Sequence, residues 1–404
     1  MTLPLLPSFI IAGFECSTPI NRDYRRIDEL ALTQHDRYVH EDYRRLSELG
    51  ICAARDGVRW NLVDQRGHLD FSSVLPFLEA ARAEGITVVW DLFHYGYPDD
   101  LDPFEDDFIV RFADYCYAFA RLAARHSDAI PFYTPVNEIS YFAWAGGDQG
   151  LFAPHARGRG PELKRQLTRA SIAGMDAILA VDPRARFVHC DPLVHVVAPA
   201  DAPHLAGEAE YFNYHFVHEA WDMLAGIKAP ELGGNPRYLD IIGANYYGIN
   251  QWEHQRPNSV LAPDDPRRVP FAELLKRLYA RYRRPIIVSE TSSQGELRAG
   301  WLREIGEECL HALDSGVDLH GLCIYPVMDM FEWHEHAGEP LRMGLWELCR
   351  ADHDHACLER IAHEPAVCEI RRLQARAQRR LAYHHGHSST LRRQEAKPHT
   401  LRRN

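Results

Sequence analysis

Long hydrophobic runs are missing from this sequence of 404 residues. No window approaches 18 uncharged apolar residues, so we expect no membrane-spanning helix and no membrane contact. The first 15 residues lack a charged start and a clean cleavage site, and two prolines and a serine interrupt their apolar stretch, which argues against a signal peptide. The nine cysteines are scattered without a CxxC pair, a pattern typical of reduced thiols. These absences predict a cytoplasmic protein.

Nucleotide-binding signatures are missing as well. No G-x-G-x-x-G opens a predicted helix, and there is no P-loop. Asp and Glu number 57 against 45 Lys and Arg, giving a formal net charge of −12, which makes nucleic acid an unsuitable partner for the body of the chain. We expect no cofactor and no metal. The segment DHDHAC at residues 352–357 mimics a metal site, but we do not expect it to bind one, whereas HEH at residues 334–336 is expected either to line a pocket or to face solvent.

Positive charge is concentrated at the C-terminus. From Arg371 to Asn404 there are nine Arg and one Lys against one Glu, about +9, so the rest of the chain carries about −21. We expect a basic final helix and then a disordered tail at residues 386–404. A contact between this tail and an acidic partner, or the acidic body of the chain itself, is the alternative.

Short apolar, β-branched runs alternate eight times with longer amphipathic ones. The expected strands lie at residues 8–16, 51–60, 86–95, 131–138, 186–196, 240–248, 285–292 and 318–329. The expected helices lie at residues 43–50, 72–85, 107–127, 161–181, 211–226, 271–283, 298–316 and 366–385. Eight such units without an internal linker predict an α/β fold, a single-domain (β/α)8 TIM barrel over residues 3–385, with a doubly wound sheet as the alternative.

The active site of such a barrel lies at the C-terminal ends of the strands. The side chains expected there are Arg55, Trp60, His94, Asn137, Glu138, Asn245, Tyr246, Tyr247, Glu290, Tyr325, Asp329, Glu332 and Trp333. Taken singly, a Glu at a strand end is more often a salt-bridge partner or helix cap, and a buried Arg is often half of an ion pair. Convergence at one face favours a site in which two carboxylates oppose each other, as glycoside hydrolysis requires.

Several segments resemble glycoside hydrolase family 1, in order along the chain. YTPVNEI at residues 133–139 is similar to the T-x-N-E-P segment, and ARDGVRWNLVD at residues 54–64 resembles R-F-S-I-S-W. DLFHYGYPDDL at residues 91–101 resembles Y-H-W-D-L-P, and DIIGANYYG at residues 240–248 resembles D-F-I-G-I-N-Y-Y. IYPVMDMFEWHEH at residues 324–336 resembles W-S-L-L-D-N-F-E-W, and LRMGLWEL at residues 341–348 the R-F-G-L segment. The chain is identified as resembling this family, or a close divergent relative in the same clan.

The resemblance implies roles for the residues that match. Glu138 would be the acid/base and Glu290 the nucleophile, which Arg55 and Tyr247 would support. The residues implied to bind the sugar are His94, Asn137, Asn245, Tyr325, Glu332 and Trp333. Glu332 stands where a phospho-sugar subgroup carries Ser, which favours a neutral glycone.

Three departures from the family pattern concern the sugar pocket. VSETSS replaces I-T-E-N-G around Glu290, and Tyr95 stands where the family has Trp. The family's N-terminal Gln is missing near Ile20, so Glu15 or Asn21 is a candidate substitute. We therefore expect a retaining β-glycosidase, similar to β-glucosidases, that acts on a small-molecule glycoside or oligosaccharide through a covalent glycosyl-enzyme. A transglycosidase with the same two carboxylates is one alternative, and a non-catalytic carbohydrate-binding protein is another.

Overall fold

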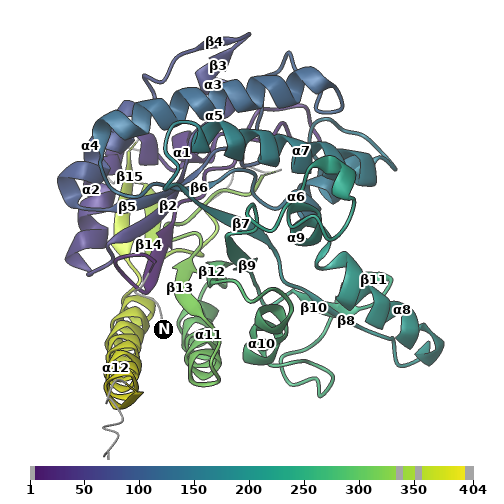
Figure 1. Ribbon diagram of the computed structural model, residues 1–404, viewed down its shortest axis with the longest axis vertical. Coiled ribbons are helices and arrows are strands. Elements are labelled where there is room, and N and C mark those ends of the chain that lie inside the picture. Colours follow the sequence, from purple (N-terminus) through teal and green to yellow (C-terminus); the bar gives the residue numbers. More distant parts are fainter. Residues whose placement is uncertain (1–4, 334–339, 351–356, 396–404) are drawn as a thin grey trace, which may run out of the picture.

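The eight predicted apolar runs form eight short parallel strands that close into a barrel (Figure 1). In chain order the strands are β1 (Ile10–Gly13), β2 (Ala53–Gly57), β5 (Thr87–Asp91), β6 (Phe132–Thr134), β7 (Arg186–Pro192), β9 (Ile241–Asn245), β12 (Ile286–Thr291) and β13 (Leu319–Ile324). Each pairs with its chain neighbour, and β13 pairs with β1 through Ile10 and Leu322 to close the ring. The computed structural model describes residues 5–333, 340–350 and 357–395. The predicted (β/α)8 barrel is confirmed.

Helices surround the barrel on its outer side (Figure 1). The main ones are α2 (His35–Glu48), α4 (Leu75–Glu84), α5 (Asp106–His126), α7 (Gly160–Leu179), α9 (Glu219–Leu224), α10 (Phe271–Tyr282), α11 (Leu297–Asp314) and α12 (Glu364–Glu395). In α5, Phe108, Phe112, Tyr115 and Phe119 recur every three or four residues and are buried, so one face of the helix covers the strands. Buried apolar residues thus fill the space between strands and helices, and a second cluster fills the barrel interior.

Shorter elements decorate the loops. The short helices are α1 (Glu29–Leu32), α3 (Trp60–Val63), α6 (Ile139–Phe142), α8 (Ala206–Tyr211), the π-helical η1 (Ala143–Asp148) and η3 (Phe212–Phe216), and the 3₁₀ turns η2 (Pro203–Leu205) and η4 (Pro230–Leu232). The small sheets are the hairpin β3 (Asp64–Gln65) with β4 (His68–Leu69), the pair β14 (Trp346–Arg350) with β15 (Leu358–Ala362), and β8 (His195–Val197), β10 (Gln251–Glu253) and β11 (Arg256–Val260). The prediction of a single helix at residues 211–226 is wrong. The segment is divided between η3 and α9, because the φ of −100° and ψ of 0° at His218 interrupt the helix.

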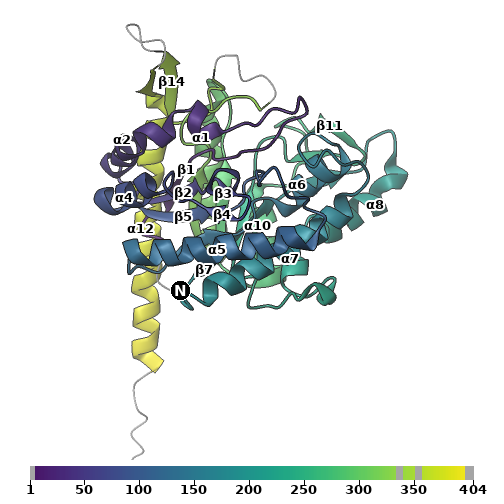
Figure 2. The ribbon, with the colours of Figure 1, turned by 90° about the horizontal axis from the view of Figure 1, so that it is seen from above.

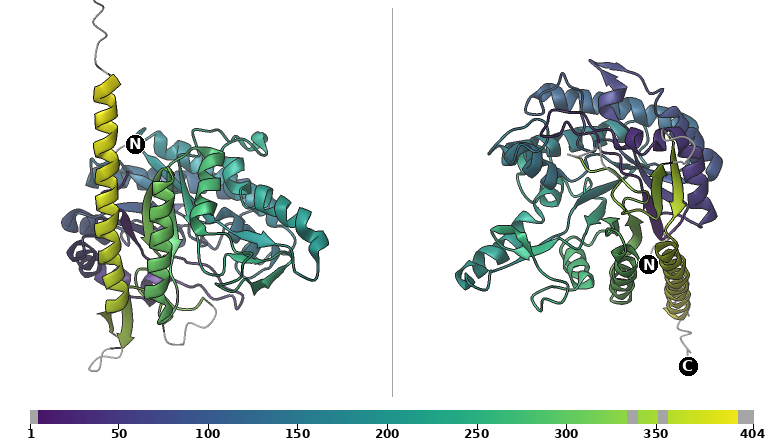
Figure 3. Two further views of the ribbon diagram at one scale, coloured as in Figure 1. Left: turned by 90° about the horizontal axis from the view of Figure 1, so that it is seen from below. Right: turned by 180° about the vertical axis from the view of Figure 1, so that it is seen from behind.

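The last helix, α12, packs beside α11 and extends beyond the barrel (Figures 2 and 3). It continues to Glu395, ten residues past the expected end at His385. The predicted division into a barrel and a tail stays a prediction. Residues 334–336 and 352–356, to which the HEH and DHDHAC segments belong, lie outside the described residues. All nine cysteines are free thiols. Among the described helices, none is both long enough and apolar enough for a membrane crossing.

A buried ionic cluster ties α2 to the barrel. The ring of His35 stacks on Phe14 at 3.7 Å between centroids, with its Nδ1 2.9 Å from Asp42 and its Nε2 2.9 Å from Asp56. Arg360 on β15 donates to Asp42 at 3.1 Å. Although burial disfavours the charged imidazole, Asp56 and Asp42 raise the pKa of His35 to about 9. The cluster is therefore expected to hold a protonated His35 between two carboxylates.

We expect this cluster to make stability depend on pH. The folded-state pKa of His35 lies above its unfolded value of about 6.5, so its contribution is complete below pH 6.5 and is lost as the pH rises through about 9. The shift corresponds to roughly 3 kcal/mol of unfolding free energy. Urea unfolding of the wild type and of His35→Gln, between pH 6 and pH 9.5, measures it. The difference in unfolding free energy between the two proteins should shrink with rising pH, and a difference that stays constant would contradict the prediction.

Candidate active site

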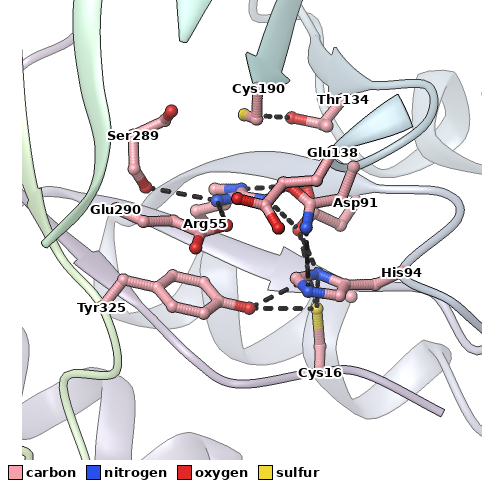
Figure 4. Close-up of polar contacts among 12 residues, drawn as sticks. Cys16, Arg55, Asp91, His94, Thr134, Glu138, Cys190, Ser289, Glu290 and Tyr325 are labelled. Carbon is pink, nitrogen blue, oxygen red and sulfur yellow. Dashed lines mark hydrogen bonds and ion pairs between the residues drawn. The ribbon is translucent and has the colours of Figure 1, made fainter. Parts of the chain in front are cut away.

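Arg55 on β2 is at the centre of the polar cluster inside the barrel mouth (Figure 4). Its guanidinium has acceptors within 3.2 Å for all five N–H groups: Nε and Nη2 contact Asp91, Nη1 contacts Glu290 and the carbonyl of Ser289, and Nη2 contacts Asn137. Its side chain is 3% exposed. Although burial opposes ionisation, Arg55 and His94 lower the pKa of Asp91. Arg55 is thereby fixed in position with its Nη1 group toward Glu290.

Glu290 lies near the end of β12 and is buried. Its Oε1 accepts a hydrogen bond from Arg55 at 2.7 Å, and its Oε2 accepts one from the hydroxyl of Tyr247 at 3.0 Å. The pKa of Glu290 is raised to about 7, because burial and, to a smaller extent, the charge of Glu138 raise it while Arg55 opposes them. A cation and a hydroxyl donor therefore stabilise the ionised form of a carboxylate that is otherwise poorly solvated.

Glu138 lies four residues beyond β6, where α6 begins. Its φ of 46° and ψ of 61° are left-handed, a conformation in which a glutamate is strained. The next turn is fixed by Ser140, whose N–H and hydroxyl both donate to Asp191, at 3.0 and 2.6 Å. The Glu138 carboxylate accepts hydrogen bonds from Tyr95 and from Asn245, the latter at 2.9 Å. Burial raises its pKa, and these two bonds oppose that rise.

His94 and Asn137 connect the two carboxylates to Asp91. Arg55 donates to Oδ1 of Asn137, so the Nδ2 amide group of Asn137 faces Nε2 of His94 at 3.0 Å. An amide N–H can only donate, so Nε2 accepts and Nδ1, 3.0 Å from Asp91, carries the proton. Burial disfavours the charged ring, yet the Asp91 hydrogen bond and Glu15 raise the pKa of His94. The hydrogen-bond pattern of Asn137 favours the neutral ring in this structure.

Tyr325, directly after β13, forms the floor of the site. Its ring stacks parallel to His94 with centroids 6.0 Å apart, and Arg55 lies over it at 4.9 Å. Gly13 makes this possible, because a Cβ there would lie 2.1 Å from Cδ2 of Tyr325. Tyr325 is 1% exposed. Its hydroxyl lies 3.9 Å from Sγ of Cys16 (Figure 4).

The donor atoms of Cys16, Asp91 and His94 lie within 4.8 Å of one another, close enough to consider a metal. The chemistry of the set does not fit a cation. Asp91 is already paired with Arg55 and bonded to His94, and burial raises the pKa of the Cys16 thiol well above its usual range. We interpret the group as part of the hydrogen-bonded support beneath the two glutamates.

Glu15, rather than Asn21, lies beside the other site residues. The Asn21 side-chain amide is bonded to backbone groups: Nδ2 donates to the carbonyl of Trp333, and Oδ1 accepts from the N–H groups of Asp23 and Arg25. Glu15, in contrast, has Oε1 3.9 Å from Nε2 of His94. Its pKa is raised by burial and, to a smaller extent, by the charge of Glu290. Of the two candidates, Glu15 therefore faces the other site residues.

The remaining predicted residues divide into two groups. Trp333 is partly buried beside Tyr95, with ring centroids 5.9 Å apart, and its indole Nε1 is enclosed without a hydrogen-bond partner among the described residues. Glu332 beside it is also partly buried. Three expected residues lie outside the site: Trp60 begins α3 and packs against helix α5, Tyr246 stacks on Phe271, and Asp329 accepts backbone N–H groups of the β13–β14 connection.

Placing Trp60 on the second strand was wrong. β2 ends at Gly57, and the chain turns at Arg59, whose ψ of 88° begins α3. Sequence reasoning also missed Asp91, which orients both Arg55 and His94. The signal was present, because Asp91 ends the apolar run of β5 as Glu138 follows that of β6.

No protein-family model matches the sequence, and no curated protein matches it. Solved structures are similar, however. A family 1 β-glucosidase from Thermotoga maritima gives a TM-score of 0.67 at 18% identity over 84% of this chain and 86% of that chain. The β-glucosidase of that organism in complex with castanospermine gives 0.71 at 15%, and its complex with deoxynojirimycin gives 0.69 at 16%, each over 91% of this chain and 98% of that chain. The chain therefore has the fold of the family 1 β-glucosidases, as its motifs predicted.

Proposed function

We propose that the protein is a retaining β-glycosidase that hydrolyses a β-linked glycoside through a covalent glycosyl-enzyme. The observation that carries the proposal is the unequal environment of the two buried glutamates. Glu290 is bonded to a guanidinium and a hydroxyl, whereas Glu138 is bonded to two neutral donors. The first environment suits an ionised nucleophile and the second an acid that must gain and lose a proton.

The reaction has two steps. Glu290 attacks the anomeric carbon while Glu138 gives its proton to the departing oxygen, which forms the glycosyl-enzyme. Glu138 then takes a proton from water, which attacks the same carbon and releases the sugar with its β configuration retained. Arg55 and Tyr247 hold the Glu290 carboxylate toward the sugar throughout.

The charges around the site support a neutral glycone. Glu15 adds a carboxyl group beside His94, and the charge of Glu332 acts on Tyr141, whose ring lies 5.6 Å from that of Tyr95. The guanidinium of Arg55 is already fully bonded. A phosphorylated or carboxylated sugar would be repelled there. His94 and Asn137 would each exchange a present hydrogen bond for one to a sugar hydroxyl, whereas the indole N–H of Trp333 has no partner among the described residues and could donate to one directly. Two solved structures of the same fold are β-glucosidase complexes with castanospermine and deoxynojirimycin.

The test is a panel of aryl β-glycosides: glucoside, galactoside, fucoside, xyloside, mannoside and glucuronide. We expect one neutral glycoside to be turned over, with ¹H NMR detecting the β-anomer as the first product. Transfer of the sugar to added alcohols in preference to water would identify a transglycosidase instead. Binding without turnover of any glycoside would favour the carbohydrate-binding alternative.

We expect activity to fall at low pH. Because the pKa of Glu290 is about 7 and its ionised form must attack, kcat/KM should decrease tenfold for each pH unit below about 7. A profile of kcat/KM from pH 4 to pH 9 measures this decrease, which forms the acidic limb of the profile. Tyr247→Phe, which loses a donor to Glu290, should move the limb to higher pH, and a limb that does not move would contradict the assignment to Glu290.

A further inference from the structure

Tyr95 follows His94 at the barrel mouth and is held in one position. It is 2% exposed, and its ring stacks on Phe142 and Phe152, with centroids 5.6 and 6.0 Å away. Trp333 meets it edge on, at 87°. The φ of Tyr95 is 64°, a left-handed conformation that a bulky residue adopts only when its surroundings impose it. Backbone and packing together fix where its hydroxyl lies.

That hydroxyl is bonded on both sides. It donates a hydrogen bond to Oε2 of Glu138 and accepts one from Nδ2 of Asn137 at 3.2 Å. The orientation of the Asn137 amide is set by Arg55, which donates to its Oδ1 at 2.6 Å. Because the amide N–H of Asn137 donates a hydrogen bond to the phenol oxygen, the hydroxyl hydrogen of Tyr95 points at Glu138 instead.

The other oxygen of Glu138 has a different kind of partner. Oε1 accepts from Nδ2 of Asn245 at 2.9 Å, and Ser289 fixes that amide by donating to its Oδ1 at 2.5 Å. An amide N–H₂ group has no acceptor capacity, so a proton on Oε1 would point at another proton. A proton on Oε2 would meet a phenol oxygen, which can accept it once the hydroxyl turns. The two oxygens are therefore not equivalent.

We propose that Tyr95 is a positioning residue that makes Oε2 of Glu138 the oxygen that carries the catalytic proton, and that its hydroxyl sets the pH above which the acid step fails. The inference rests on the proposed function. In the acid step the O–H bond at Oε2 breaks, its proton goes to the glycosidic oxygen, and the electrons of the breaking C–O bond go to that oxygen. The Tyr95 hydroxyl then turns to donate to the new carboxylate. In the second step Oε2 recovers a proton from water, and Tyr95 turns back.

Tyr95 is one of several titratable groups that act on Glu138. The others facing it are Asp191 on β7, His94 beside Tyr95, Tyr141 on α6, Tyr247 after β9 and Glu290 on β12. All of these stay in place when Tyr95 alone is changed. Burial raises the pKa of Glu138, and the Tyr95 hydrogen bond lowers it, because a donor stabilises the carboxylate. Removal of the hydroxyl should therefore keep Glu138 protonated to higher pH.

The experiment compares pH profiles of kcat/KM for wild type and Tyr95→Phe, with a glycoside whose leaving group requires protonation. We expect the alkaline limb of Tyr95→Phe to move up by about one pH unit. Replacement of Tyr95 by 3-fluorotyrosine, a stronger hydrogen-bond donor of nearly the same shape, should move it down. Tyr133→Phe is the matched control, since Tyr133 on β6 packs against Phe187 in the core. An unmoved limb in an active Tyr95→Phe protein would overturn the inference while leaving the proposed function intact.

A second measurement does not depend on turnover. The carboxyl carbons of ¹³C-labelled glutamate are titrated by NMR, with Glu138→Gln identifying the Glu138 signal. We expect its midpoint to be higher in Tyr95→Phe than in wild type. If the wild type cleaves no glycoside, the proposed function fails, and equal midpoints in the two proteins would separately overturn the role of Tyr95.

Discussion

Glu290→Ala is expected to lower kcat on an aryl β-glycoside by more than about 10⁴-fold, because the variant has no group to attack the anomeric carbon. Folding should survive the change, because the buried Arg55, which loses Glu290, keeps Asp91 as its counter-charge at 2.7 Å. Added azide is small enough to enter the space left by the side chain. We expect it to restore slow turnover and to give the α-glycosyl azide, because a single displacement inverts the configuration. Steady-state kinetics and ¹H NMR of the product measure both effects.

The matched control is Glu296→Ala, an exposed carboxylate at the start of the helix that follows β12. It should leave kcat within about twofold of wild type. A Glu290→Ala protein that retained activity, with an unchanged melting temperature, would remove Glu290 from the reaction. Recovery of a β-glycosyl azide instead would mean that another residue is the nucleophile.

Glu138→Ala is expected to affect substrates according to their leaving groups. With a phenyl glycoside, kcat/KM should fall by roughly 10²–10⁴-fold, the usual contribution of a general acid. With a 2,4-dinitrophenyl glycoside, whose leaving group needs no proton, kcat/KM should change little. The second step still lacks its base, so the glycosyl-enzyme should accumulate and produce a burst of dinitrophenol. Stopped-flow absorbance measures the burst, and mass spectrometry detects the protein with one bound sugar.

Azide separates this variant from Glu290→Ala. It should speed release from the Glu138→Ala protein and give the β-glycosyl azide, the opposite anomer. The control is Glu162→Ala, an exposed carboxylate in the first turn of α7. An equal loss on both glycosides would show that Glu138 has a role other than proton transfer, such as support of the fold.

The barrel and its two glutamates could be predicted because the signals for them are local. Each strand is a short apolar run, each helix has an apolar stripe, and Glu138 and Glu290 lie at the ends of such runs. The polar partners were harder to predict, because their contacts join segments far apart in the chain. Arg55 and Glu290 lie 235 positions apart, and only the family resemblance paired them, because neither residue specifies the other locally.

Tyr95 shows a different limit. The sequence marks it as a departure from the family pattern, but residue type alone does not reveal where the hydroxyl points. That depends on a left-handed backbone at Tyr95 and another at Glu138, neither of which local propensity predicts for these residues. Trp60 was misplaced for a related reason. An apolar residue after a strand suits either a longer strand or a new helix, and the turn at Arg59 determines which forms.

The closure of the barrel through β1 and β13 has a consequence for how the chain folds. Ile10 pairs with Leu322, which lies 312 positions later in the chain, so β1 acquires its second neighbour in the ring only after β13 has been synthesised. Parallel pairings over such separations slow folding, because the entropy of the intervening chain is lost before the contact forms. Until β13 pairs with it, the free side of β1 in the β1–β2 pair is an unpaired apolar edge. During synthesis, that edge is the part of the molecule most exposed to pairing with another chain.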